Sequence, residues 1–158
     1  MKVTAMYSSE IKMRLELALE AAQMAVWDSE IHGPDVGDSY VIWSAKGAEL
    51  LGRKPHPLQH RFNEFLLCVH PDDRQYVRHT LQQAIDLCTD YALEYRVVWP
   101  DSSVHWLAAK AQVFCGADGA ALRTLGIIWD LTTRKQIELE TAEKKRVDGS
   151  LKSTSPPR

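Results

Sequence analysis

The chain has 158 residues, which is long enough for one domain with a hydrophobic core and short for two. Its 19 basic and 21 acidic residues give a formal charge of -2, so the net charge favours neither nucleic acid nor an anionic membrane as a partner. No run of 18 apolar residues could span a bilayer, and the first residues lack the apolar stretch of a secretory signal. We therefore expect a cytoplasmic protein.

Three cysteines, Cys68, Cys88 and Cys115, occur at wide spacings without a Cys-x-x-Cys pair. An odd number at these spacings argues against a disulfide framework and against a zinc ribbon. We expect small, buried or half-buried apolar side chains in a reducing compartment.

The first half of the chain predicts a helix, two strands and short helical pieces. Apolar residues recur at helical spacing over about residues 10–22. Residues 24–31 and 40–43 are β-favouring runs that a polar loop joins. Short helical pieces are expected over residues 45–51, followed by a loop that contains two prolines.

The second half predicts one long helix and three strands. The helix follows His70-Pro-Asp-Asp73 and ends near Leu87, with an apolar stripe of Val77, Leu81, Ala84 and Ile85. Residues 91–99, 104–114 and 121–131 then predict strands, separated by turns that contain Pro, Gly, Asp and Ser. A charged helical pattern begins at residue 133.

Four short motifs occur in a characteristic order: His70-Pro71-Asp72-Asp73, Glu94-Tyr95-Arg96, the Asp101–Trp106 hairpin, and Asp130-Leu131-Thr132-Thr133-Arg134-Lys135. Together they resemble a PAS sensor domain with its C-terminal PAC motif, over about residues 15–140. Ser102 stands where the family usually has Gly. Leu131 and Thr133 depart from the family's Asp-Ile-Thr-Glu-Arg-Lys.

The resemblance implies an α+β fold: a five-stranded antiparallel sheet with short helices and one long helix on one face, flanked by N- and C-terminal helices. We divide the chain accordingly. Residues 1–22 form a cap and dimerisation helix, residues 23–132 the PAS domain, and residues 133–147 an exit helix. Residues 148–158 have the composition of a disordered tail.

A PAS domain offers a cavity between the sheet and the long helix, where a small molecule can bind. The candidate wall residues are apolar side chains of the predicted strands and of the long helix: Val26, Val41, Val77, Leu81, Leu93, Tyr95, Val97, Trp106, Ile127 and Trp129. Each of them could instead simply fill the core.

Cofactors are possible, although we expect none. Haem-binding relatives take an iron ligand from the long helix, where His79 lies; the helical period places His79 on the far side from Val77, so we expect it to be exposed and dispensable. The reactive-cysteine motif of flavin photosensors is absent around Cys68, although tryptophans could stack on a noncovalent flavin. His56 and His60 have metal-ligand spacing, but the flanking prolines exclude the helix that this spacing requires, so we predict no metal site.

No motif of a hydrolase, kinase or P-loop enzyme is present, so any catalysis is expected in an effector. The resemblance implies a sensory or interaction module that binds a small ligand or a partner and relays a signal to an effector such as a histidine kinase or a cyclic-di-nucleotide enzyme. We expect a homodimer that buries Ile11, Leu15 and Ala18; otherwise this stripe folds back on its own sheet. The alternatives are a haem- or flavin-based redox or gas sensor and a noncatalytic regulatory subunit.

The exit junction contains Asp130, Thr132 and Thr133. We predict that a threonine caps the helix, Thr132 rather than Thr133. The Asp130 charge should either lie near the positive helix end or pair with a basic side chain. The following segment has too thin an apolar seam for a stable coiled coil, which favours a solvated charged helix.

Overall fold

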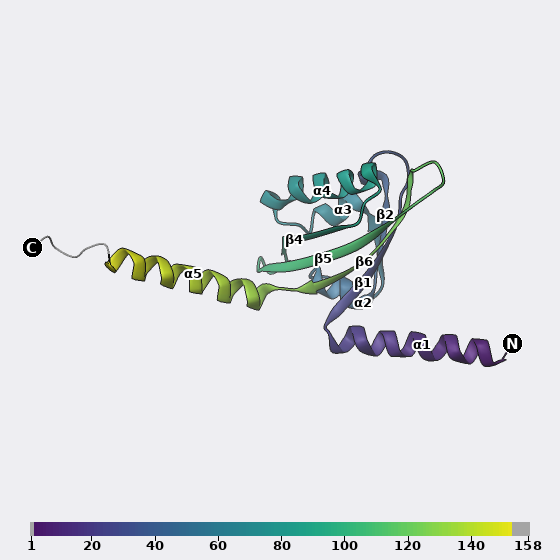
Figure 1. Cartoon of the computed structure of the whole chain (residues 1–158), viewed down its shortest axis with the longest axis horizontal. Helices are drawn as coiled ribbons and strands as arrows, with labels where there is room; N and C mark the ends of the chain where they lie inside the picture. Colours follow the sequence, from purple (N-terminus) through teal and green to yellow (C-terminus); the bar gives the residue numbers. More distant parts are fainter. Residues whose placement is uncertain (1, 153–158) are drawn as a thin grey trace, which may run out of the picture.

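The computed structural model describes the backbone of residues 2–152 and the side chains of residues 8–152. Its centre is one antiparallel sheet with the strand order β3-β2-β1-β6-β5-β4 (Figure 1). The strands are β1 (Met24–Glu30), β2 (Tyr40–Trp43), β3 (Leu58–Arg61), β4 (Tyr91–Val98), β5 (Val104–Cys115) and β6 (Ala121–Asp130). The helices are α1 (Lys2–Ala21), α2 (Ala45–Leu50), α3 (Phe62–Leu66), α4 (Arg74–Leu87) and α5 (Thr132–Lys152), with short 3-10 turns at Val36–Asp38 and Pro71–Asp73.

The predicted α+β architecture is confirmed, with six strands instead of five. The additional strand is β3, which pairs with β2 at the edge of the sheet in the register Trp43↔Leu58 and Val41↔His60. The sequence predicts a loop here, because the segment contains two prolines. Its pairing with β2 is a contact between segments that are distant in the sequence.

The hydrophobic core lies between one face of the sheet and α2, α3 and α4. Leu93, Tyr95 and Val97 of β4 are buried on this inner face, as their alternation with polar residues predicts. Trp27 of β1 lies directly opposite Gly126 of β6. A Cβ atom at Gly126 would lie 2.5 Å from the Trp27 ring, so glycine is what allows this ring to fit.

The hairpin between β4 and β5 accommodates a residue other than glycine at its tightest point. Ser102 adopts φ 68°, in the left-handed region that glycine favours. The Asp101 carboxylate accepts hydrogen bonds from both the amide and the hydroxyl group of Ser103. The departure from the family's glycine is therefore tolerated, and the side chain of Asp101 braces the turn.

The two terminal helices leave the domain in opposite directions (Figure 1). Helix α1 begins well before the predicted residue 10, and α5 continues to Lys152, past the predicted end at residue 147. Helix α5 passes through Gly149, which costs about 1 kcal/mol in a helix interior without necessarily ending it. The rest of the predicted tail, residues 153–158, lies outside the described residues. Within the described part of the chain, no helix is both long and apolar enough to cross a membrane.

The prediction of three unpaired cysteines is wrong for two of them. Cys88 and Cys115 form a disulfide between the end of α4 and the end of β5. They are 27 residues apart in the sequence, and the fold brings their Cα atoms to 6.3 Å. Cys68 is free and buried, as expected.

Candidate functional site

A small, mostly apolar cavity lies between the inner face of the sheet and α4. Its volume is about 30 Å³, which is room for one or two water molecules. The wall comes from four strands, two helices and the loop before β2: Trp27, Ser29, Ile31, Val36, Val41, Trp43, Phe62, Leu81, Ile85, Tyr91 and Thr124.

Hydroxyl groups supply most of the polarity of this wall. Ser29 of β1 and Thr124 of β6 are directly opposed in the sheet, and both are buried. Burial raises the pKa of the Tyr91 phenol, against a smaller lowering by the Thr124 hydroxyl, so Tyr91 remains neutral at physiological pH. The cavity therefore offers neutral hydrogen-bonding groups and no fixed charge.

Of the predicted wall residues, only Val41 and Leu81 line this cavity. The residues of the predicted set that are buried in the core without lining it are Val77, Leu93, Tyr95 and Val97. The wall residues that the prediction missed include Trp27, Ile85 and Tyr91. The sequence contains a signal for two of them. Trp27 lies two residues after Ala25 in a β-favouring run, which places both on the same face of a strand. Ile85 belongs to the predicted stripe of the long helix.

Val26, Trp106, Ile127 and Trp129 lie on the opposite, outer face of the sheet, so their assignment to the cavity wall is wrong. Val26 pairs with Ile127, and Ile127 pairs with Lys110, whose side chain is exposed. Directly opposed residues in an antiparallel sheet share a face. The strands β1 and β6 carry apolar residues on both faces, so alternation alone did not distinguish inside from outside.

The cavity does not fit the cofactors considered from the sequence. Ligand pockets for such groups measure about 300–1,000 Å³, whereas this cavity measures about 30 Å³. His79 is exposed on α4, as its helical position predicts, and does not line the cavity. Neither haem nor flavin could enter without a large displacement of the aromatic wall.

His56 and His60 do not lie on one helical face. His56 lies in the exposed loop before β3, whereas His60 belongs to β3 and packs near Trp43. Among the described residues, no group of three or more His, Cys, Asp or Glu side chains is arranged to hold a metal ion. The His60 Nε2 atom is buried without a hydrogen-bond partner, and burial lowers the pKa of this imidazole.

The exit junction connects α5 to the sheet through side chains of its first turn. The Thr132 hydroxyl accepts a hydrogen bond from the Trp106 amide of β5 at 3.0 Å, and the Asp130 carboxylate accepts one from the Thr132 amide at 2.6 Å. The predicted threonine cap is therefore wrong: Asp130 satisfies the first helical amide, and Thr132 joins the helix to β5. The Asp130 charge lies near the positive end of the helix, one of the two expected positions.

A second set of contacts leads from α5 to the beginning of α4. Lys135 lies 2.6 Å from the Glu94 carboxylate and 4.9 Å from the centre of the Trp106 ring. The guanidinium group of Arg96 lies 5.5 Å from the same ring and binds Asp73, which immediately precedes α4. The hydrogen bond from Arg96 lowers the pKa of the Asp73 carboxyl group, so this pair is fully charged at neutral pH.

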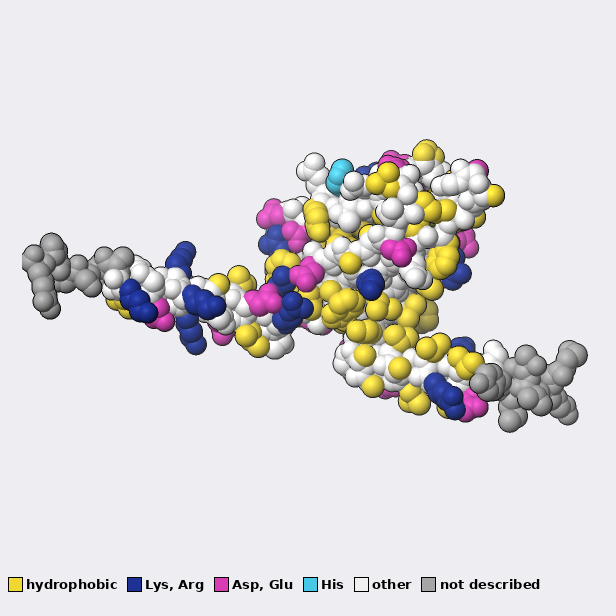
Figure 2. Space-filling view, in the orientation of Figure 1, with side chains coloured by type: hydrophobic (Ala, Val, Ile, Leu, Met, Phe, Trp, Pro, Cys, Tyr) yellow, Lys and Arg dark blue, Asp and Glu magenta, His cyan; other side chains and the backbone are white. Residues whose placement is uncertain are grey.

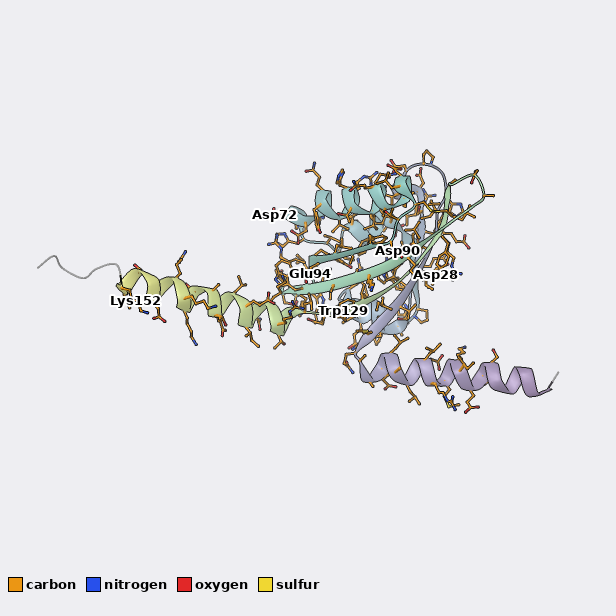
Figure 3. All side chains as sticks on the ribbon, viewed as in Figure 1. Asp28, Asp72, Asp90, Glu94, Trp129 and Lys152 are labelled. Carbon is orange, nitrogen blue, oxygen red and sulfur yellow. A yellow bond between two sulfur atoms is a disulfide. The ribbon has the colours of Figure 1, made fainter. Side chains whose placement is uncertain are left out.

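In Figure 3, Glu94 lies close to the first turn of α5. Both strands of the β4–β5 pair therefore hold this turn. The backbone of β5 contacts it at Trp106, and the side chain of Glu94 contacts it from β4. A change in the sheet at these strands would act directly on the first turn of α5.

The predicted dimerisation residues are exposed in the monomer. The residues Ile11 and Leu15 are 44% and 60% exposed, and Ala18 is exposed as well. The alternative, in which this stripe folds back on its own sheet, is wrong. Figure 2 shows hydrophobic side chains along α1 and on the side of the domain that faces it.

Comparisons with known proteins agree with this architecture. The sequence model of a family described as PAS fold matches residues 40–128, which is more than half of the chain. The chain is 28% identical over 154 residues to the probable diguanylate cyclase DgcE of Escherichia coli; this match covers 97% of the chain and 13% of DgcE. The chain thus spans a small part of this curated relative.

Two solved structures show the same fold. A sensory box histidine kinase/response regulator from Burkholderia thailandensis superposes with a TM-score of 0.67 at 26% identity, covering 85% of this chain and 98% of that one. The N-terminal domain of a diguanylate cyclase with PAS/PAC sensor from Marinobacter aquaeolei superposes with a TM-score of 0.58 at 15% identity, covering 71% and 98%. The second likeness concerns the fold alone.

Proposed function

Because the chain belongs to the PAS fold family, we propose that it is a cytoplasmic sensory module that binds a small ligand or a partner protein, forms a homodimer and relays a signal to an effector. The effector in this proposal is a histidine kinase or a cyclic-di-nucleotide enzyme, the kinds of protein in which similar domains occur. Catalysis belongs to that effector.

The observation that carries this proposal is the attachment of α5 to the sheet. Trp106 contacts α5 through its backbone amide and through its ring, and the same ring lies next to Arg96, which binds Asp73 at the start of α4. A displacement of α4 or of the β4–β5 pair therefore changes the contacts that orient the exit helix. This arrangement supports the proposed relay of a signal through α5.

Homodimer formation is supported by the surface of α1. Ile11 and Leu15 are exposed on one side of a helix that extends away from the domain core. A second copy that packs against this stripe would remove it from water. Light scattering on the full chain, on a chain without residues 1–22 and on Leu15→Lys tests this: the full chain should be dimeric and both variants monomeric. Glu16→Gln, on a neighbouring exposed position, is the control, and an unchanged dimer without residues 1–22 contradicts a helix-mediated dimer.

Ligand binding in the cavity requires a small ligand or a movement of the wall, because the cavity measures about 30 Å³. An absorption spectrum of freshly purified protein distinguishes the proposal from the alternative of a haem or flavin sensor. The proposal expects no band in the visible region. A Soret band or a flavin band would overturn it in favour of cofactor chemistry.

A further inference from the structure

Two cysteines meet where α4 and β5 end. Cys88 immediately follows α4 and Cys115 is the last residue of β5, with Cα atoms 6.3 Å apart, inside the range of about 4.4–6.8 Å that disulfides require. Both residues are half-buried, so each is partly open to solvent. Cys68 is buried and takes no part in the pair.

The backbone at Cys88 is unusual for a cysteine. It has φ 50° and ψ 51°, the left-handed conformation in which helices commonly end at a glycine or an asparagine. A side chain with a Cβ atom has a steric cost in this conformation. A residue that persists in a disfavoured conformation suggests a function for its side chain, which here is the sulfur atom.

This turn is also part of the cavity wall. Ile85 and Tyr91 line the cavity, and each is three residues from Cys88. The carboxylate of Asp90, a residue labelled in Figure 3, accepts a hydrogen bond from the Val113 amide of β5 at 3.1 Å. The turn between α4 and β4 is therefore held to β5 by one covalent bond and by one hydrogen bond that would persist without it.

We propose that Cys88 and Cys115 are a reversible redox site that reacts with low-molecular-weight disulfides such as oxidised glutathione. A thiolate of the pair attacks the disulfide RS–SR, forms a mixed disulfide and releases one RSH after proton uptake. The second protein thiolate attacks the protein sulfur of the mixed disulfide and releases the second RSH. The two cysteines are oxidised, and one RS–SR is reduced to two RSH.

The site gives the domain an input that requires neither a cavity ligand nor a second copy. In the oxidised state, the end of α4 is covalently joined to β5, and Ile85 and Tyr91 are held in the cavity wall. In the reduced state, the Asp90 contact and apolar packing hold the same turn, so this part of the wall opens more often. Redox state thus controls access to the cavity from the end of α4.

The test uses the full chain equilibrated in mixtures of reduced and oxidised glutathione, from a cytosolic to a secretory-pathway balance. Free thiols are alkylated after acid quenching and counted by mass spectrometry. As the share of oxidised glutathione rises over this range, the number of free thiols per chain should fall from three to one. Oxidation of the reduced protein and reduction of the oxidised protein should give the same midpoint. Hydrogen exchange of amides 85–91 should be several-fold faster in the reduced protein.

Two cysteine variants show whether the change in free thiols comes from Cys88 and Cys115. Cys68→Ala should retain a transition between two free thiols and none, whereas Cys115→Ser should lose it and instead accumulate a mixed disulfide at Cys88. Three outcomes each overturn the proposal: three free thiols throughout the range, a disulfide that resists its reducing end, or equal exchange rates in the two states. Hydrogen exchange of the protein without substitutions tests the proposal even where a variant folds poorly.

Discussion

The Lys135 ammonium group of α5 lies 2.6 Å from the Glu94 carboxylate of β4. The same ammonium group lies 4.9 Å from the centre of the Trp106 ring on β5, so one side chain joins the exit helix to two neighbouring strands. The Lys135 side chain is only 23% exposed, which protects the contact from the full screening of water and salt.

Lys135→Met should loosen the start of α5. The variant removes the ion pair with Glu94, a longer ion pair with Glu138 and a cation–π contact, which together contribute about 1 kcal/mol. Hydrogen exchange should become faster at amides 136–139, with little change in the sheet. Arg134→Met is the matched control, because Arg134 pairs with Glu138 inside the same helix. Equal effects of the two variants would mean that Lys135 supports only the helix and does not couple it to the sheet.

Asp130→Ala and Thr132→Val should have separable effects. Asp130→Ala removes the acceptor of the first helical amide and should cost about 0.5–2 kcal/mol, with faster exchange at amides 132–135. Thr132→Val leaves the Trp106 amide without its acceptor, so the protection lost should include Trp106 of β5. Thr133→Ala, at an exposed position, should change neither region. If Thr133→Ala alone increases exchange at amides 134–137, Thr133 is the cap.

His60→Gln should remove a pH dependence of stability. Burial lowers the pKa of His60, so below about pH 6.5 the unfolded chain binds a proton that the folded protein does not. The free energy of unfolding should therefore fall as the pH decreases from about 6.5, and this contribution should level off below the folded pKa. Urea unfolding at several pH values measures the slope.

Comparison with a second histidine variant isolates the contribution of His60. His79→Gln, at an exposed position of α4, should retain the slope of the unmodified protein. A slope that is the same in His60→Gln and in His79→Gln would assign the pH dependence to other groups.

Gly126→Ala should destabilise the fold. The added Cβ atom would lie 2.5 Å from the Trp27 ring, and overpacking of this kind costs about 1–3 kcal/mol. Thermal unfolding should occur at a lower temperature, and the tryptophan fluorescence should change. Gly149→Ala is the control, since an added Cβ there meets no atom within 4 Å and alanine favours the helix. An unchanged melting temperature for Gly126→Ala would show that Trp27 can move without cost.

Local patterns in the sequence correctly predicted much of the fold. Leu93, Tyr95 and Val97 alternate with polar residues, and this pattern identified the buried face of β4 because the other face of the strand is more exposed to solvent. The stripe of Val77 and Ile85 predicted which side of α4 is buried, and the same period predicted that His79 is exposed. The motif order identified the family that the chain belongs to.

Only the tertiary structure decided the features that depend on contacts between distant segments. Val26, Ile127 and Trp129 lie on strands with apolar residues on both faces, so the register of β1 with β6 was needed to place them outside. Thr132 binds the Trp106 amide instead of its own helix, because β5 begins beside the first turn of α5. The pairing of Cys88 with Cys115 likewise depends on the distance between the end of α4 and the end of β5. The number of residues between the two cysteines does not predict that distance.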